Sequence, residues 1–205
     1  MASLYFKYSA MNSGKSTQLL QAHYNYRERG MTPLAVTAAI DDRYGIGKIT
    51  ARIGLELPAE LFASDTDLFA MVEDKIAAGE KIHAVLVDEA QFLTEEQVAQ
   101  CAKIVDEIGI PVMAYGLRTD FLGKFFPGSE ALMRMADNIE EIKTICWCGS
   151  KATHTARMDE NGTVLKEGEQ ISIGGNDVYI ALCRKHHTAG QSHPEEKQSV
   201  LNTAA

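Results

Sequence analysis

Short apolar runs recur along the first two thirds of the chain, at spacings typical of an α/β sheet. Residues 3–8, 33–38 and 111–116 are predicted strands because each is a compact run rich in apolar and β-branched residues. The stretch HAVLVDEAQ at 83–91 is nearly continuous in its apolar character before it ends in two acids. This is the pattern of a strand buried on both faces of a parallel sheet.

Segments with helical spacing lie between these runs. Residues 15–29 are predicted to form a helix that stops at Gly30, and 66–78 and 94–108 repeat their apolar positions at the same period. Thr94 is suited to cap the last of these helices. Strands that alternate with helices predict an α/β fold, with a parallel sheet covered on both faces.

The pattern changes near residue 140, where short β-like runs replace helices and Asn161-Gly162 indicates a hairpin turn. Earlier in the chain, 41–57 has no clean period and is predicted to be a loop or a short hairpin. We expect one domain over 1–143, a smaller domain over 144–190, and a polar tail over 191–205 that is predicted to be disordered.

Composition and charge narrow the class of protein. The 205 residues are 45% hydrophobic and 23% charged, which is ordinary for a globular protein. The net charge of −8 argues against nucleic acid as the main partner, since such binders usually carry a basic stripe. No apolar run is long enough to span a membrane, and the first residues do not form a secretion signal. We therefore expect a cytoplasmic protein with no membrane partner, whose four cysteines are metal ligands or core thiols rather than disulfides.

The stretch YSAMNSGKSTQ at 8–18 matches the second half of a phosphate-binding loop. Gly14 lets the backbone approach a phosphate, Lys15 can reach the outer phosphates, and the Ser16 hydroxyl can ligate magnesium. Ser9 stands where the usual pattern opens with glycine. The alternative is an ordinary turn at a helix start, but the predicted strand before the loop and the helix after it favour a nucleotide site.

Two acids support the same interpretation. Asp88 ends an apolar strand, where proteins with this loop carry the acid that helps to hold magnesium. Glu89 could activate water or take a proton from an acceptor hydroxyl. Alternatively, both acids are merely solvated at a strand end. In combination with the loop they predict a site for a nucleoside triphosphate.

Cys146, Cys148, Cys183 and His186 form a C-x-C and a C-x-x-H pair. Thiolates and imidazole suit tetrahedral zinc, and four protein ligands make a structural site. Core cysteines beside a surface histidine are the alternative, and His187 leaves the fourth ligand ambiguous. Cys101, alone within a predicted helix, is expected to be a core thiol.

Together, YSAMNSGKST, VDEAQF, the C-x-C and C-x-x-H pairs and ISIGGNDVYIALCRKH resemble the thymidine kinases that have a P-loop core and a zinc-bearing lasso. The resemblance spans about residues 3–187 and is nearest to bacterial members. It implies a RecA-like P-loop α/β domain at 1–143 with a parallel sheet, and a small β-rich zinc-binding lasso domain at 144–190.

The resemblance also implies a reaction: ATP phosphorylates the 5′-hydroxyl of deoxythymidine, with Glu89 as the base and magnesium near Ser16 and Asp88, to give thymidine monophosphate and ADP. Arg43 stands where the family has an arginine. We expect Arg43 either to contact phosphate or to form an ion pair on the solvent side. The residues implied to bind ATP are Ser9, Ala10, Met11, Asn12, Ser13, Gly14, Lys15, Ser16, Asp88 and Gln91. Those implied to bind the nucleoside are Met11, Phe92, Leu117, Phe121, Phe126, Thr155, Gln170, Ile171, Ser172, Ile173, Gly174 and Tyr179.

Members of this family are usually tetrameric and inhibited by thymidine triphosphate, so the resemblance implies a homotetramer with that feedback inhibitor. Two other classes of protein remain open. One is a P-loop ATPase whose zinc unit binds nucleic acid, against which the acidic charge speaks. The other is a non-catalytic nucleotide-binding module stapled by zinc, against which the set Lys15, Ser16, Asp88 and Glu89 speaks.

Overall fold

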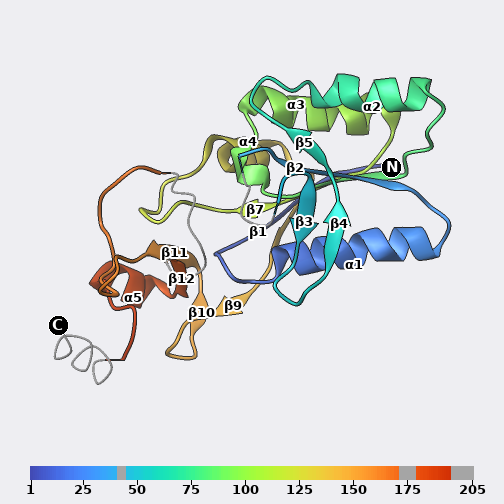
Figure 1. Cartoon of the computed structure of the whole chain (residues 1–205). Coiled ribbons are helices and arrows are strands. Elements are labelled where there is room, and N and C mark those ends of the chain that lie inside the picture. The colour runs from blue at the N-terminus through green and yellow to red at the C-terminus, as the bar shows by residue number, and fades with distance from the viewer. Residues whose placement is uncertain (41–44, 171–178, 195–205) are drawn as a thin grey trace. The chain divides into compact units, whose positions relative to one another are not determined.

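The structure is a computed structural model that describes residues 1–40, 45–170 and 179–194 (Figure 1). The chain divides into two compact units. Unit 1 comprises Met1–Tyr8, Gly14–Leu117 and Phe126–Glu141, and unit 2 comprises Ser9–Ser13, Arg118–Phe125 and Ile142–Ala205. Each unit is described separately below.

A six-stranded sheet forms the centre of unit 1, with the strand order β5-β2-β6-β7-β1-β8. The pairs β1–β8, β2–β5, β2–β6 and β6–β7 are all parallel, which confirms the sheet predicted from the sequence. All four residues of β6 are buried, as expected for a strand covered on both faces. The strands are β1 (Leu4–Ser9), β2 (Pro33–Ala38), β5 (Glu60–Phe62), β6 (Ala84–Val87), β7 (Val112–Leu117) and β8 (Asn138–Glu141).

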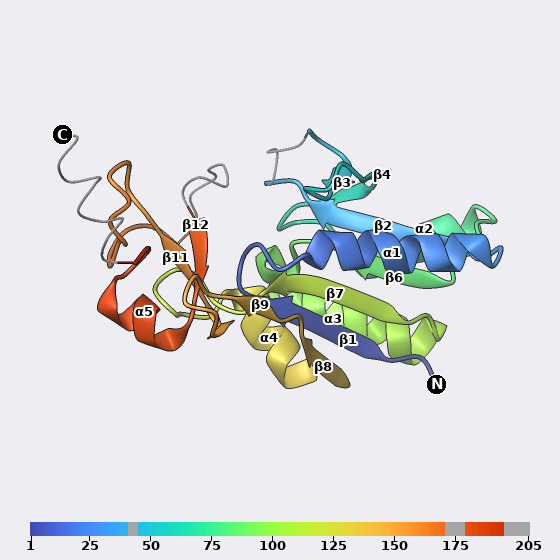
Figure 2. The same ribbon diagram turned by 90° about the horizontal axis from the view of Figure 1, so that it is seen from below.

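Helices cover both faces of this sheet. Helix α1 (Lys15–Glu28) lies on one face, and α2 (Leu68–Ala77), α3 (Glu95–Lys103) and α4 (Pro127–Met135) lie on the other (Figures 1 and 2). Thr94 caps α3 in a capping box with Gln97, as its sequence position predicted. Among the described residues, every helix is too short or too polar to traverse a lipid bilayer.

Two predicted elements of unit 1 end earlier than their apolar pattern indicated. The strand expected over 83–91 stops at Val87, because Glu89 has a left-handed backbone with φ of 52° and Ala90–Phe92 form the 3-10 helix η1. The helix expected over 94–108 is α-helical only to Lys103, after which Ile104–Ile108 continue as the π-helix η2. Such turns are frequent at functional sites and are not visible in a hydrophobic period.

Other elements of unit 1 follow short or local signals. The segment 41–57 contains the start of an antiparallel hairpin, β3 (Lys48–Thr50) with β4 (Glu56–Pro58), which confirms the short hairpin as far as the described residues go. Cys101 is fully buried in the core, as expected for a core thiol, and burial raises its pKa.

In its described residues, unit 2 is built from short strands and one short helix. Strand β9 (Thr144–Ile145) pairs with β10 (Lys151–Ala152), and β11 (His154–Arg157) pairs with β12 (Tyr179–Leu182), both antiparallel. Helix α5 (Arg184–Ala189) follows β12. The 159–163 turn, with Gly162 donating to the carbonyl of Asp159, confirms the hairpin turn predicted at Asn161-Gly162. The core of this unit is small, so it needs a further source of stability.

Candidate nucleotide site and metal centre

The phosphate-binding loop connects the end of β1 to the start of α1. Gly14 is the N-cap of α1 and has a left-handed backbone with φ of 83°, a conformation that glycine adopts without strain. Lys15 and Ser16 are the first two residues of the helix, and no acidic residue lies in its first turn. The positive end of the helix dipole is therefore not neutralised by an acid of the helix itself, which favours the binding of an anion there.

Asp88 lies against Ser16 at the carboxyl end of β6. The Ser16 hydroxyl donates to Asp88 Oδ2 at 3.1 Å, while Asp88 Oδ1 is buried without a hydrogen-bond partner among the described residues. Burial, and secondarily the charge of Glu89, raise the pKa of Asp88 to about 7, although Lys15 and the Ser16 hydrogen bond act in the opposite direction. A buried carboxylate oxygen beside a hydroxyl suits a hard divalent cation, whose charge would offset the burial. These residues therefore fit magnesium.

Glu89 is held by Gln91. The Gln91 Nε2 amide donates to Glu89 Oε2, and Gln91 Oε1 accepts from the backbone N–H of Leu117 at 2.9 Å. The backbone N–H fixes which end of the amide is the oxygen, so the NH₂ group must face the carboxylate. A Cβ at position 116 would lie 2.9 Å from the backbone nitrogen of Gln91, so this position requires glycine. Gln91, which the resemblance assigns to the ATP site, thus contacts the proposed base.

The aromatic residues of unit 1 that the resemblance assigns to the nucleoside pack together. The rings of Phe92 and Phe126 meet edge to face, with centroids 5.9 Å apart. The carbonyl of Leu117 accepts a hydrogen bond from Ser129 at 2.6 Å. Such contacts are also found in ordinary cores, so the geometry of unit 1 alone does not assign these residues to a ligand.

In unit 2 the structure brings the first part of the loop against β11 and β12. The backbone N–H of Met11 donates to Thr155 Oγ1 at 3.0 Å, and Asn12 Nδ2 lies 3.5 Å from the carbonyl oxygen of Tyr179. Ser9 Oγ donates to the carbonyl of Ala10 at 2.7 Å and accepts from the Ser13 hydroxyl. The missing first glycine is therefore replaced by a serine with hydrogen bonds inside the loop.

Phe121 and Gln170 lie in a second part of unit 2. The Arg157 guanidinium sits 4.2 Å from the centroid of the Phe121 ring, and Gln170 Nε2 donates to Asp120 Oδ2 at 3.0 Å. The sequence did not single out Asp120, which is buried and also accepts from the N–H groups of Leu122 and Lys124. An aspartate three residues before Gly123 is a turn signal that could have been used. Residues 171–174 and Arg43 lie outside the described residues.

The four predicted metal ligands converge. The ligand atoms of Cys146, Cys148, Cys183 and His186 all lie within 4.8 Å of one another. The distance from His186 Nδ1 to the sulfur of Cys146 is 3.4 Å, and to that of Cys183 also 3.4 Å, while the sulfurs of Cys148 and Cys183 are 4.0 Å apart. Around tetrahedral zinc, ligand atoms at bond lengths of ~2.0–2.3 Å lie roughly 3.5–3.8 Å apart. The cluster is therefore compatible with zinc.

Local structure explains the ligand pairs. Cys146 and Cys148 belong to a turn closed by hydrogen bonds from Gly149 and to Ser150, whereas Cys183 is the N-cap of α5 and His186 lies one turn further on. The first pair thus comes from a turn and the second from a helix start. Hydrogen bonds from Ser150 lower the pKa of Cys148 to about 6, which favours the thiolate that a metal binds.

The two neighbouring histidines have different surroundings. The ring of buried His186 stacks on Trp147 with centroids 4.1 Å apart, close to the thiols. His187 Nε2 instead lies 2.8 Å from the carbonyl oxygen of Phe121, and its ring stacks on His154. The metal cluster therefore contains His186.

The parallel sheet, the Gly14-Lys15-Ser16 start of α1 and the buried Asp88 define unit 1 as a P-loop α/β core of the RecA-like kind. Unit 2 is a small β-rich unit whose Cys₃His cluster is compatible with zinc. A family model described as thymidine kinase matches residues 2–187. The chain belongs to the thymidine kinase family, and the predicted resemblance is confirmed.

Individual relatives agree with this over nearly their whole length. The chain is 56% identical to the thymidine kinase of Vibrio vulnificus, covering 91% of this chain and 97% of that protein. It is 56% identical to the thymidine kinase of Haemophilus influenzae, covering 91% and 96% of the two chains. With the thymidine kinase of Ruegeria pomeroyi it shares 53% identity over 96% of this chain and 99% of the other.

Proposed function

We propose that this chain transfers the γ-phosphoryl group of ATP to the 5′-hydroxyl of deoxythymidine, forming thymidine monophosphate and ADP for nucleotide salvage. The observation that carries the proposal is its 53–56% identity to thymidine kinases over almost their full length. The arrangement of Lys15, Ser16, Asp88 and Glu89 within unit 1 supports it, because a phosphoryl transfer needs these kinds of group. The alternative ATPase with a nucleic-acid-binding zinc unit is not favoured.

The donor side of the reaction rests on the loop and on β6. Backbone N–H groups of Gly14, Lys15 and Ser16, at the start of α1, would bind the phosphate oxygens of ATP, and the Lys15 side chain would bind the outermost of them. Ser16 and Asp88 would hold magnesium, whose charge, when it is bound, offsets the negative charge of the transferred group. Together they position the γ-phosphorus and reduce the repulsion that an incoming oxygen meets.

Glu89 would act on the acceptor. Its carboxylate accepts a hydrogen bond from the 5′-hydroxyl and takes the proton as the 5′-oxygen bonds to the γ-phosphorus. The bond between the γ-phosphorus and the oxygen bridging to the β-phosphate breaks, and ADP leaves with that electron pair. Gln91 orients the Glu89 carboxylate through the amide described above. Glu89 also has a left-handed backbone with φ of 52°, a conformation that is costly for a residue other than glycine and that clusters at functional sites.

Base recognition would rest on residues of unit 2. Met11 and Phe121 offer apolar surface to the C5-methyl group, and Thr155, Gln170 and Tyr179 flank them. The hydrogen bond from Gln170 to Asp120 would fix the chain just before 171–174, which the resemblance assigns to the polar edge of the base. The assignment of Phe92, Leu117 and Phe126 to the nucleoside stays a prediction.

We also propose that the Cys₃His cluster is a structural zinc site. Four protein ligands leave no open position for water or substrate, so the metal would supply stability and not chemistry. The homotetramer, inhibition by thymidine triphosphate, the cytoplasmic location, the role of Arg43 and the domain boundaries at 143 and 190 stay predictions.

Thymidine is expected to be preferred over purine nucleosides by roughly 10²-fold or more in kcat/KM. A pocket closed around one pyrimidine ring excludes a bicyclic base on steric grounds. The measurement is initial rates with magnesium–ATP and either thymidine, adenosine or guanosine as the acceptor. Comparable kcat/KM values for thymidine and adenosine would contradict the proposed base specificity.

Replacing Gln91 by leucine is expected to lower kcat roughly tenfold with little change in the KM for ATP, because the Glu89 carboxylate loses the donor that orients it. The matched control is Gln100→Leu. Gln100 Oε1 also accepts from a backbone N–H, that of Leu68, at 2.9 Å, so both variants lose one amide-to-backbone hydrogen bond. Equal effects of the two substitutions on kcat would show that Gln91 is only structural.

A further inference from the structure

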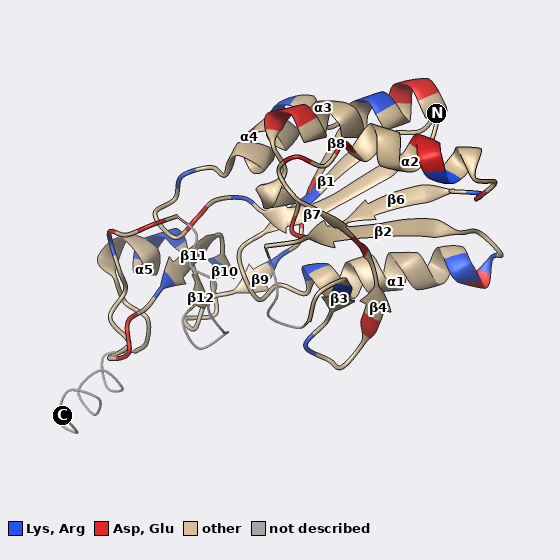
Figure 3. Ribbon diagram, turned by 45° about the horizontal axis from the view of Figure 1, so that its top comes forward, with Lys and Arg blue, Asp and Glu red and all other residues tan. Residues whose placement is uncertain are grey.

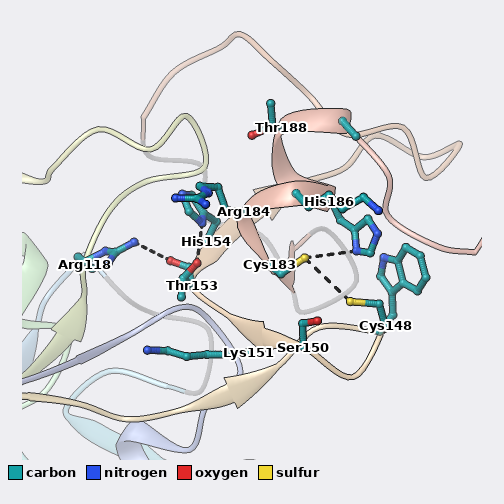
Figure 4. Close-up of a pocket in the computed structure, with 13 residues that line it drawn as sticks. Arg118, Cys148, Ser150, Lys151, Thr153, His154, Cys183, Arg184, His186 and Thr188 are labelled. Atoms are coloured by element: carbon teal, nitrogen blue, oxygen red, sulfur yellow. Dashed lines mark hydrogen bonds between the residues drawn. The ribbon is translucent and has the colours of Figure 1, made fainter.

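A pocket in unit 2 is lined by basic side chains beside the metal cluster (Figure 4). Its volume is about 1300 Å³, and its lining residues are Arg118 and members of the stretch 147–189, all of them in unit 2. Four of them are basic and none is acidic. The basic residues are Arg118, Lys151, Arg184 and Lys185.

The positive charge of this pocket contrasts with the negative net charge of the whole chain. The whole sequence has 28 acidic and 20 basic residues and a net charge of −8. The acidic residues of α2 and α3 in unit 1 colour parts of the ribbon red in Figure 3. A pocket with four basic residues and no acid is therefore a local feature that needs its own explanation.

The negative charge of the metal cluster would neutralise only part of the positive charge in the pocket. A zinc ion with three thiolates and a neutral histidine carries one net negative charge, so about three of the four positive charges would remain. In Figure 4, Arg118, Lys151 and Arg184 lie on one side of the pocket, and the group of Cys148, Cys183 and His186 lies on the other. The basic residues are thus more numerous than the thiolates require.

The basic residues of the pocket differ in how firmly they are held. Arg118 donates through Nη2 to the carbonyl of Thr153 at 3.0 Å, which fixes its guanidinium at the pocket wall. Arg184 and Lys185 are exposed in the first turn of α5, and neither belongs to an ion pair within the described part of the chain. Arg184 and Lys185 can therefore turn toward a ligand without breaking an ion pair within the described residues.

The state of His154 agrees with a positive potential in the pocket. Burial is the main cause that lowers its pKa to about 4, and the charges of His187, Arg118 and Arg184 lower it further. Its ring is therefore neutral near pH 7 and adds no positive charge to the four basic residues. Hydroxyl groups of Ser150, Thr153 and Thr188 line the same pocket and could donate hydrogen bonds to an anion.

We propose that this pocket binds a compact polyanion through its phosphate groups, either a nucleoside polyphosphate or an inorganic polyphosphate. Lysine and arginine are the side chains that bind phosphate most strongly, and four of them lining one pocket favour a ligand with more than one phosphate group. A long nucleic acid strand is disfavoured, because it would also have to run along an otherwise acidic chain. Lys15 and Ser16 do not line this pocket, so it is not the ATP site proposed above.

The test measures binding of inorganic tripolyphosphate to the zinc-loaded full chain by titration calorimetry. It is carried out in a Lys15→Ala background so that the phosphate loop contributes little. Arg184→Gln with Lys185→Gln is expected to weaken binding about tenfold or more, the usual scale for losing charge-assisted hydrogen bonds. The matched control is Lys124→Gln with Lys143→Gln, which removes two positive charges from exposed positions of unit 2 outside the pocket and should leave binding unchanged.

Zinc content is measured for each variant, because Arg184 and Lys185 lie between two metal ligands. Lys151→Gln, on β10, provides a second variant that is not adjacent to a ligand, and it should also weaken binding. Wild-type affinity in both pocket variants, or equal weakening in the control, would overturn the proposal. The proposal would also be overturned if the Lys15→Ala parent itself did not bind tripolyphosphate.

A comparison of ligands separates the two sources of phosphate. ATP binding more tightly than tripolyphosphate, with the same loss in the pocket variants, would assign the site to a nucleotide. Equal affinities would assign it to the phosphate chain alone, and both results support a polyphosphate site. A single-stranded oligonucleotide that binds more tightly than either, and that depends on Arg184 and Lys185, would contradict the compact ligand and favour a nucleic-acid surface.

Discussion

Replacing Glu89 by glutamine is expected to lower kcat for thymidine phosphorylation roughly 10²- to 10⁴-fold, the usual range for the loss of a general base. An alcohol is a poor nucleophile, so the reaction depends on a group that orients the 5′-hydroxyl and takes its proton. Glutamine keeps the shape of the side chain and can still accept the hydrogen bond from Gln91, but it cannot take a proton. The loss should therefore fall on the chemical step.

ATP binding should survive in this variant, because Gly14, Lys15 and Ser16 are unchanged. The measurements are kcat for thymidine and the Kd for ATP in the same preparation. Glu96→Gln is a suitable control, since Glu96 is an exposed acid in the first turn of α3. Near-native kcat in Glu89→Gln would show that another group, or none, activates the acceptor.

Asp88→Asn should behave differently from Glu89→Gln. Asp88 Oδ2 accepts from Ser16, and its other oxygen is buried with no hydrogen-bond partner in the described part of the chain, which is why we assign Asp88 to magnesium. Its loss should raise the magnesium concentration needed for half-maximal rate as well as lower the rate. The two acids can thus be separated by one magnesium titration for each variant.

Removing two metal ligands together, Cys183→Ser with His186→Ala, is expected to abolish zinc binding and the ordered structure of unit 2. Structural zinc sites in small domains contribute ~10–16 kcal/mol on binding, which is more than a small core can replace. The purified wild-type chain should hold about one zinc ion. Metal analysis by mass spectrometry measures this directly.

Trp147 provides an optical readout of the same event. It is the only tryptophan of the chain, and its ring stacks on His186. Loss of the metal should expose the indole and shift its emission to longer wavelengths. Cys101→Ala and His193→Ala are the controls, because neither residue belongs to the cluster, and both should keep zinc and the native emission. Zinc-free wild-type protein, prepared without chelator, or full zinc retention in the double variant would refute the site.

The sequence predicted those parts of the fold that depend on long runs of one kind of residue. The apolar run that contains Leu86 and Val87 is a central strand, and Thr94 caps a helix, because burial and capping are decided locally. Strands β5 and β8 were not predicted, because each is an edge strand with one neighbour and few buried residues. Helix α4 was not predicted either, although Pro127 at its start is a recognised signal for the first turn of a helix.

The parts of the site that could be predicted are those whose functional residues lie close together in the sequence. Two cysteines two residues apart, and a cysteine and a histidine three residues apart, indicated the metal ligands, but the choice between His186 and His187 depends on how α5 starts from Cys183. The contact between Gln91 and Glu89 could not be read from the chain, because it requires the left-handed backbone at Glu89 and a backbone N–H from β7. Contacts of this kind exist only once separate elements pack.

The most direct test of the proposed function follows the fate of the γ-phosphoryl group. The zinc-loaded full chain is incubated with magnesium–ATP, with and without thymidine, and the products are resolved by phosphorus NMR. Our account predicts thymidine 5′-monophosphate and ADP in equal amounts, and almost no ATP consumption without thymidine. ADP and inorganic phosphate formed at the same rate with or without thymidine, and no thymidine monophosphate, would show that the chain is an ATPase and contradict the account.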